Sequence, residues 1–275
     1  MEESGNFLEK QDVINVLQEF QCKIKNLPNY FYRYRSCNKN SLKALNKNRI
    51  YLSYAEWVND PYDCSVRSEE LEKLPIVIDD ILPTNQVYND IIKSFRKFPE
   101  LQADMIQEKK KMVNFQKNEK KQIEIECEKV FDSLKTTKIA CFSTKKDSIL
   151  MWSHYADYHK GFCIEYKNSE NSDFFKRIMP VIYSHTFYCW KDYKYFLITK
   201  YKDWSCENEW RYWEMEQDTE YVNSPTPTAV YCGAKMSEYN IKQIVKIAKK
   251  NSFDVYQIYP AKDRYELDFK EIYKI

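Results

Sequence analysis

Residues 207–214 read Glu-Asn-Glu-Trp-Arg-Tyr-Trp-Glu, and this stretch decides the fold class. Its aromatic and charged side chains alternate, which is typical of a β-strand. We expect Trp210 and Tyr212 to face one side of that strand, and Glu209 and Arg211 to face the other. A buried charge is unfavourable unless it is paired. A charged strand face beside tryptophan and tyrosine therefore indicates a functional site as well as a core.

Two other islands combine aromatic with charged or hydroxylated side chains. Residues 32–35 read Tyr-Arg-Tyr-Arg, and residues 151–155 read Met-Trp-Ser-His-Tyr. On a strand, Arg33 and Arg35 lie on the same face, with the two tyrosines on the other. The arginine guanidinium offers paired donors that suit a diphosphate. We expect these islands to meet the 207–214 stretch at one site.

Each charged island also has a purely structural interpretation. Arg33 could form a salt bridge with Glu207, Glu209 or Asp63. This is compatible with a diphosphate site, because an arginine without its ligand often rests on a carboxylate. Glu207 and Glu209 could hold sugar hydroxyls and stabilise a cationic sugar carbon. Alternatively, they could form an ion pair with Arg211, and the sequence does not separate these two roles.

The order of the other elements predicts an α+β protein. We expect one domain over residues 1–275, with a charged helical insert at residues 69–135. Helices are expected at residues 7–24 and 192–206, after Ser41 and after Ser237. Further strands are expected at residues 31–34, 49–54, 138–143, 162–166, 181–183, 229–233, 253–258 and 265–269.

Composition narrows the function classes. The chain has 275 residues and a net charge of +2, so no global field attracts it to nucleic acid, and such binding would need a local patch. No apolar run reaches the roughly 20 residues of a membrane span. The N-terminus lacks a signal-peptide core, which favours a cytoplasmic protein without a membrane partner. Nine cysteines, an odd count without a Cys-x-x-Cys pair, predict reduced thiols.

Glycine content excludes the common nucleotide-binding loops. The chain contains three glycines, which are far apart in the sequence. The Gly-x-Gly-x-x-Gly and Walker A loops both need closely spaced glycines that let the backbone approach phosphate. If this protein binds a nucleotide, side chains must hold the phosphates.

Two further clusters have weaker functional interpretations. Residues 59–63 read Asn-Asp-Pro-Tyr-Asp, which could bind a cation or a ribose hydroxyl but also fits an Asx turn. The spacing of His154, His159 and His185 does not suit a metal, so we expect structural histidines and no metal site. Ser153 and His154 do not form a convincing hydrolase dyad.

The islands occur in an order that resembles a widespread bacterial family of domains of unknown function. The similarity covers residues 30–270 except the insert. It rests on Tyr-Arg-Tyr-Arg, Asn-Asp-Pro-Tyr-Asp, Cys-Phe-Ser, Met-Trp-Ser-His-Tyr-Ala with Gly-Phe-Cys-Ile-Glu-Tyr, and Trp-x-x-Glu-x-Glu-Trp-Arg. That family is in turn similar to ADP-ribosyltransferases. The resemblance implies a mixed or antiparallel sheet core with flanking helices, and NAD as the substrate.

The resemblance also implies residue roles. Arg33, or alternatively Arg35, would clamp the NAD diphosphate. Glu209 would be catalytic, binding the ribose and stabilising the cationic sugar as nicotinamide leaves. Glu207 would orient the acceptor. The remaining cofactor-binding positions implied are Ser53, Tyr54 and Trp152, the last two by stacking on nicotinamide.

The expected function is that of an ADP-ribosyltransferase or NAD glycohydrolase. The acceptor would be protein, nucleic acid or water, and the resemblance suggests a role in phage defence or a toxin system. Two alternatives stay open. One is a non-catalytic module that senses a nucleotide or peptide. The other is a metal-dependent nuclease or hydrolase built on Asp60, Asp63 and the glutamates.

Overall fold

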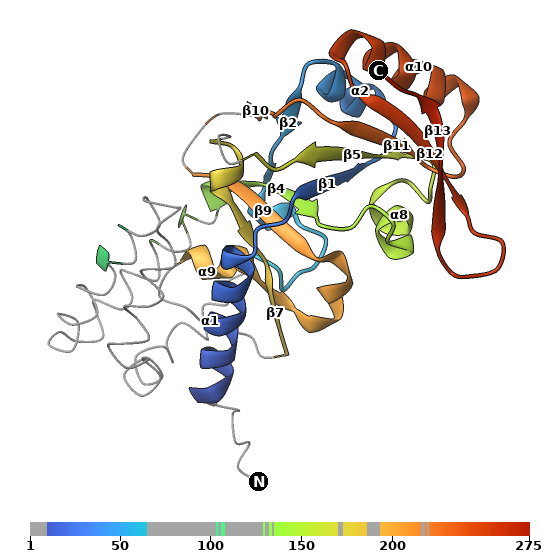
Figure 1. Cartoon of the computed structure of the whole chain (residues 1–275). Helices are drawn as coiled ribbons and strands as arrows, with labels where there is room; N and C mark the ends of the chain where they lie inside the picture. Colours follow the sequence, from blue (N-terminus) through green and yellow to red (C-terminus); the bar gives the residue numbers. More distant parts are fainter. Residues whose placement is uncertain are drawn as a thin grey trace, which may run out of the picture.

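The computed structural model describes residues 10–64, 135–169, 173–185, 193–215 and 220–275, together with isolated positions between them. Figure 1 shows these parts as coloured ribbon. Almost all of the predicted helical insert at residues 69–135 lies outside the described residues. That prediction therefore stays untested.

A mostly antiparallel sheet forms the centre of the protein (Figure 1). Among the described residues it has nine strands, and the β11–β12 pair is parallel. In spatial order they are β13 (Leu267–Tyr273), β12 (Asp254–Pro260), β11 (Ala229–Cys232), β5 (Phe162–Lys167), β1 (Tyr30–Arg35), β4 (Lys138–Ser143), β9 (Glu209–Glu214) and β6 (Ile178–Pro180), with β3 (Ser53–Tyr54) beside β4. The predicted α+β class is confirmed, and the alternation of Glu209 to Glu214 is that of a sheet strand.

Smaller elements surround this sheet. Two-stranded sheets join β10 (Tyr221–Asn223) to β2 (Arg49–Tyr51) and β7 (Ile182–Ser184) to β8 (Thr199–Tyr201). The described helices include α1 (Lys10–Lys25), α2 (Lys39–Asn46), α8 (Ile149–Tyr155), α9 (Tyr193–Ile198) and α10 (Glu238–Asn251). Single 3-10 turns are η1 (Ala55–Trp57) and η3 (Phe175–Arg177), and a longer one is η4 (Lys202–Glu207).

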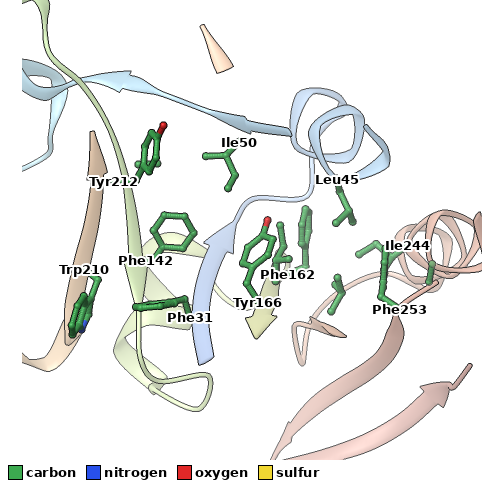
Figure 2. Close-up of a cluster of buried hydrophobic side chains, with 14 of the residues drawn as sticks. Phe31, Leu45, Ile50, Phe142, Phe162, Tyr166, Trp210, Tyr212, Ile244 and Phe253 are labelled. Carbon is green, nitrogen blue, oxygen red and sulfur yellow. The ribbon is translucent and has the colours of Figure 1, made fainter. Parts of the chain in front are cut away.

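The main core lies between one face of the sheet and the helices α2 and α10 (Figure 2). α10 begins at Ser237, whose side chain accepts from the amide of Asn240, and it buries Ile244 and Ala248. Alternation along each strand sends one set of side chains to this face. The labelled members are Phe31, Leu45, Ile50, Phe142, Phe162, Tyr166, Trp210, Tyr212, Ile244 and Phe253.

A second apolar cluster lies on the opposite face, where α8 packs on β1. Tyr32 and Tyr34 of β1 contact Met151 and Trp152 of α8 in this cluster. β1 therefore separates two environments. Its tyrosines enter the α8 cluster, while Phe31 and the arginines face the other side.

Three local predictions were wrong. Residues 192–206 do not form one helix, because residues 199–201 pair in parallel with β7 as strand β8. The cap of α2 is Asn38 instead of Ser41, since the Asn38 side chain accepts from the Ser41 amide over 2.9 Å. The predicted strand at residues 49–54 is divided into β2 and β3. In the first case, the pairing of residues 199–201 with β7 determines the strand, and the local sequence does not reveal such pairing.

Cysteine and membrane expectations can be compared with the described part of the chain. The seven cysteines there are all free thiols, while Cys127 and Cys189 lie outside it. No helix found in those residues is both long and apolar enough to cross a bilayer.

Candidate functional site

A pocket of about 300 Å³ opens where β1 and β4 diverge. β1 meets β4 at the pair Tyr32 and Ser143, while β3 meets the other end of β4 through Ser53 and Ile139. Residues from all three strands line the pocket. Its volume lies at the lower end of the roughly 300–1,000 Å³ seen for ligand pockets. The opening between the strands thus gives one cavity access to side chains from both faces of the sheet.

One wall of this pocket is cationic and is supplied by β1. We call Arg33 and Arg35 the arginine wall. Arg33 is 8% exposed, donates from Nη2 to the Tyr51 carbonyl over 2.8 Å, and lies 5.7 Å from the centre of the Phe142 ring. Within the described residues neither arginine pairs with a carboxylate. The salt bridge that the structural interpretation allowed, from Arg33 to Glu207, Glu209 or Asp63, is therefore not formed.

Without a carboxylate partner among the described residues, the charge of the arginine wall is energetically unfavourable. Burial, and after it the neighbouring Arg35, lower the pKa of Arg33, and burial also lowers the pKa of Arg35. A guanidinium nevertheless stays charged near neutral pH. A bound anion would therefore offset the unfavourable free energy of the buried arginine charge.

A second part of the lining holds Asp63, Glu207, Glu209 and Lys200, and the buried Arg211 completes their network; we call this network the carboxylate wall. Arg211 donates to both oxygens of Asp63 over 2.8 and 2.6 Å. It also donates to both oxygens of Glu209 over 2.7 and 2.9 Å. Lys200 lies 2.7 Å from Glu207, 3.2 Å from Glu209 and 3.3 Å from Asp63. With every carboxylate ionised, this wall has one negative charge in excess.

The two glutamates respond to this network in opposite ways. Burial alone would raise the pKa of Glu209, but Arg211 and Lys200 outweigh it and lower the pKa to about 2. For Glu207, burial and then the Glu209 charge raise the pKa, and Lys200 opposes them incompletely. The surroundings of Glu209 therefore favour its ionised form, whereas those of Glu207 favour its protonated form. Two carboxyl groups with diverging pKa values can divide acid–base and electrostatic roles.

Local backbone geometry points both glutamates into the pocket. Between them, Asn208 adopts a left-handed conformation with φ of 46°, which asparagine tolerates better than most residues. The Ser143 hydroxyl donates to the Glu207 carbonyl over 2.6 Å, and the Glu209 amide donates to the Tyr183 hydroxyl over 2.8 Å. These bonds fix the turn from η4 into β9.

Most of the sequence-predicted site residues meet in this pocket. The lining includes Arg33, Arg35, Ser53, Glu207 and Glu209, which are far apart in the chain. Their common location agrees with the expectation that the islands form one site.

Two predicted positions do not lie on the pocket surface. Trp152 is 0% exposed, donates from Nε1 to the Lys146 carbonyl over 2.8 Å and packs edge-on against Tyr34. Its ring is therefore covered by protein and cannot stack on nicotinamide in this structure. Tyr54 packs against Trp57 and lies beneath the Lys138 ammonium, outside the lining. Aromatic character alone did not distinguish core from pocket.

The turn at residues 59–63 is the Asx turn of one interpretation, and its last residue belongs to the site. The Asp60 side chain accepts from the Tyr62 amide over 2.9 Å, which confirms an Asx turn. Asp63, in contrast, belongs to the carboxylate wall. In the described part of the chain, no group of three His, Cys, Asp or Glu side chains could hold a metal ion.

Three residues of the site had no individual role predicted from the sequence. Lys200 lay inside a region predicted as helix, although the β-branched Thr199 beside it was a strand signal. Tyr155 ends the island at residues 151–155 and lies one helical turn after Met151, so both face the pocket. Cys141 on β4 also lines the pocket, where burial and the Glu209 charge raise the pKa of its thiol well above the ordinary value.

The comparisons with known proteins add no family to these observations. The chain matches no protein-family model, no curated protein and no solved structure.

Proposed function

We propose that this chain is an NAD-dependent ADP-ribosyltransferase-like enzyme that binds NAD as its substrate in this pocket. One observation carries the proposal: the pocket has an arginine wall that pairs with no carboxylate of the described residues, and a separate carboxylate wall with one excess negative charge when Glu207 is ionised. NAD has the complementary distribution, because its diphosphate is anionic and its nicotinamide ring is cationic. Such complementarity favours a defined orientation of the ligand.

The arginine wall would take the place of a glycine-rich phosphate loop. Arg33 and Arg35 project from adjacent positions of one strand face, and both are held in the pocket. A hydrogen bond to a charged group contributes about 1.5–3 kcal/mol. Two guanidinium groups are therefore sufficient to hold a diphosphate without backbone amides.

The carboxylate wall would act on the reacting ribose. Because Glu209 stays ionised, it can stabilise the positive charge that develops on the sugar as nicotinamide departs. Glu207 has a raised pKa and can take up the proton that an acceptor releases. The mostly antiparallel α+β sheet is compatible with the ADP-ribosyltransferase-like core implied by the motifs. We propose a protein, a nucleic acid or water as acceptor, and a place in phage defence or a toxin system.

A second candidate is a non-catalytic module that senses a nucleotide. One feature favours it: Arg211 and Lys200 already occupy both oxygens of Glu209. A carboxylate so fully bonded is stable as a structural group. In this case the pocket would bind NAD or a related nucleotide without cleaving it.

The test is nicotinamide release from NAD by the purified protein, with and without cell extract. The enzyme interpretation predicts release by the wild type and a loss of about 10²–10³-fold in Glu209→Gln. Glu214→Gln is the matched control, because Glu214 is also buried on β9 beside an arginine but does not line the pocket. Binding without release supports the sensing module, and neither binding nor release contradicts both.

A further inference from the structure

The Tyr155 hydroxyl connects Glu207 to the pocket. Tyr155 donates to Oε1 of Glu207 over 2.5 Å and accepts from the Asn59 side chain over 3.3 Å. Glu207 is 3% exposed, and Lys200 binds its other oxygen, Oε2. Tyr155 itself lines the pocket. Glu207 also lines the pocket, but Lys200 holds Oε2 and the Tyr155 hydroxyl holds Oε1. A proton from a pocket ligand can therefore reach Oε1 of Glu207 through the Tyr155 hydroxyl.

The surroundings of Glu207 favour proton uptake at this position. Burial and the Glu209 charge raise the pKa of Glu207, and burial followed by the Glu207 charge raises the pKa of Tyr155. Tyr155 thus stays protonated and keeps its hydrogen bond to the carboxylate. The titratable and charged groups around Glu207 are Tyr155 from α8, Lys200 from β8, Glu209 and Arg211 from β9, Tyr183 from β7 and Asp63 from the turn.

We propose that Tyr155 passes a proton from a neutral hydroxyl acceptor, either water or an alcohol, to Glu207. This inference rests on the proposed cleavage of NAD. The hydroxyl proton of Tyr155 is engaged in the hydrogen bond to Glu207, so the Tyr155 oxygen offers only lone pairs to the pocket. The Asn59 side chain donates to one of these lone pairs. The other can accept from a hydroxyl group. A cationic acceptor such as a guanidinium is disfavoured at this position, since the Lys200 ammonium already binds the Glu207 carboxylate.

The proposed step balances in bonds and charges. The acceptor oxygen forms a bond to ribose C1′ as the bond from C1′ to the nicotinamide nitrogen breaks. The electron pair of that bond leaves with nicotinamide, which becomes neutral. The acceptor proton moves to the Tyr155 oxygen while the Tyr155 proton moves to Glu207. Glu207 later releases this proton to solvent.

The experiment compares wild type, Tyr155→Phe and the control Tyr158→Phe in nicotinamide release from NAD across pH. Tyr158 is 70% exposed and does not line the pocket, so its change should have no effect. We expect Tyr155→Phe to lower kcat by about 10²–10⁴-fold, the range for general acid–base catalysis. The KM for NAD should not change, and the acid limb of the wild-type kcat profile should disappear. Thermal melts confirm that each variant folds.

Added acceptors test the chemical class. With methanol the wild type should form methyl ADP-ribose, and with a small alkylguanidine it should form no adduct. An alkylguanidine adduct without a methanol adduct overturns the acceptor class. If Tyr155→Phe keeps the kcat of the wild type, the proposed role of Tyr155 is wrong, while the proposal of NAD cleavage still holds. If the wild type releases no nicotinamide, the proposed NAD cleavage itself is wrong, and the inference about Tyr155 is lost with it.

Discussion

The two walls of the pocket use arginine in opposite ways. Arg211 on the carboxylate wall is 0% exposed and its charge is balanced by Asp63 and Glu209. Arg33 on the arginine wall is 8% exposed, and its described partners are a backbone carbonyl and an aromatic ring. Both side chains are buried, so burial is not what distinguishes them. The difference is whether the protein itself supplies the opposite charge.

This contrast separates structural from ligand-binding charge. A buried ion pair is costly to break, because removing one partner leaves the other unpaired. A buried cation without a carboxylate partner is already in that unfavourable state. Removing it should therefore not destabilise the protein by the same mechanism, but it should weaken the binding of an anion.

The largest expected effect is that of Arg211→Met. This change leaves Asp63 and Glu209 buried with Lys200 as their remaining cation, so we expect a loss of about 3–5 kcal/mol in the free energy of unfolding. Urea denaturation measures it. Arg264→Met is the control, because the three ion pairs of Arg264 are at the surface. An equal and small effect of both changes would show that the network is not structural.

The next effect is a dependence of stability on acid pH. The pKa of Glu209 is lowered from 4.5 to about 2, so the unfolded chain binds this proton first as pH falls. Glu209 therefore contributes about 3 kcal/mol above pH 5, and this contribution is lost as pH falls toward 2. The raised pKa of Glu207 has the opposite effect on the pH dependence of stability, because at Glu207 the folded state binds the proton first as pH falls.

Urea denaturation at pH 7, 5 and 3 measures this dependence. The free energy of unfolding of the wild type should decrease more steeply below pH 5 than that of Glu209→Gln, which lacks the titrating group. Parallel curves for the two proteins would mean that Arg211 and Lys200 do not hold Glu209 in its ionised form.

Arg33→Met tests the other wall. We expect a weakening of ADP-ribose binding by about 1.5–3 kcal/mol, the contribution of a charge-assisted hydrogen bond. The melting temperature should be unchanged or higher, because an unpaired buried charge is replaced by an apolar side chain of similar length. Calorimetric titration and thermal melts measure the two quantities. Arg49→Met is the control, since Arg49 lies on β2 over Tyr221 and outside the pocket. A large loss of stability in Arg33→Met would remove the distinction between the walls.

Much of this architecture could be predicted from local patterns. Alternation located the strands at residues 138–143 and 209–214 with their observed bounds, and the capping serine located the start of α10. Such signals depend on near neighbours in the chain. They also placed Arg33 and Glu209 on strands, and the motif order indicated that they would meet.

What could not be predicted depends on long-range pairing. The position of Lys200 follows from the parallel pairing of β8 with β7, which no local pattern reports. The shared strand face made Arg211 a candidate partner of Glu209, but that Arg33 is not its partner depends on the strand order β1-β4-β9. The burial of Trp152 follows from the packing of α8 on β1. The sequence around Trp152 does not show whether its side chain is buried or exposed.

The most direct test of the account is a calorimetric comparison of NAD with NADH at pH 8. The two ligands share the diphosphate but differ in the positive charge of the nicotinamide ring. If the carboxylate wall receives that charge, wild type should bind NAD more tightly than NADH by about tenfold, or 1.4 kcal/mol. Glu207→Gln should abolish the preference. Equal affinity of the wild type for both ligands, or no binding of either, would contradict the pairing of the two walls with the two ends of NAD.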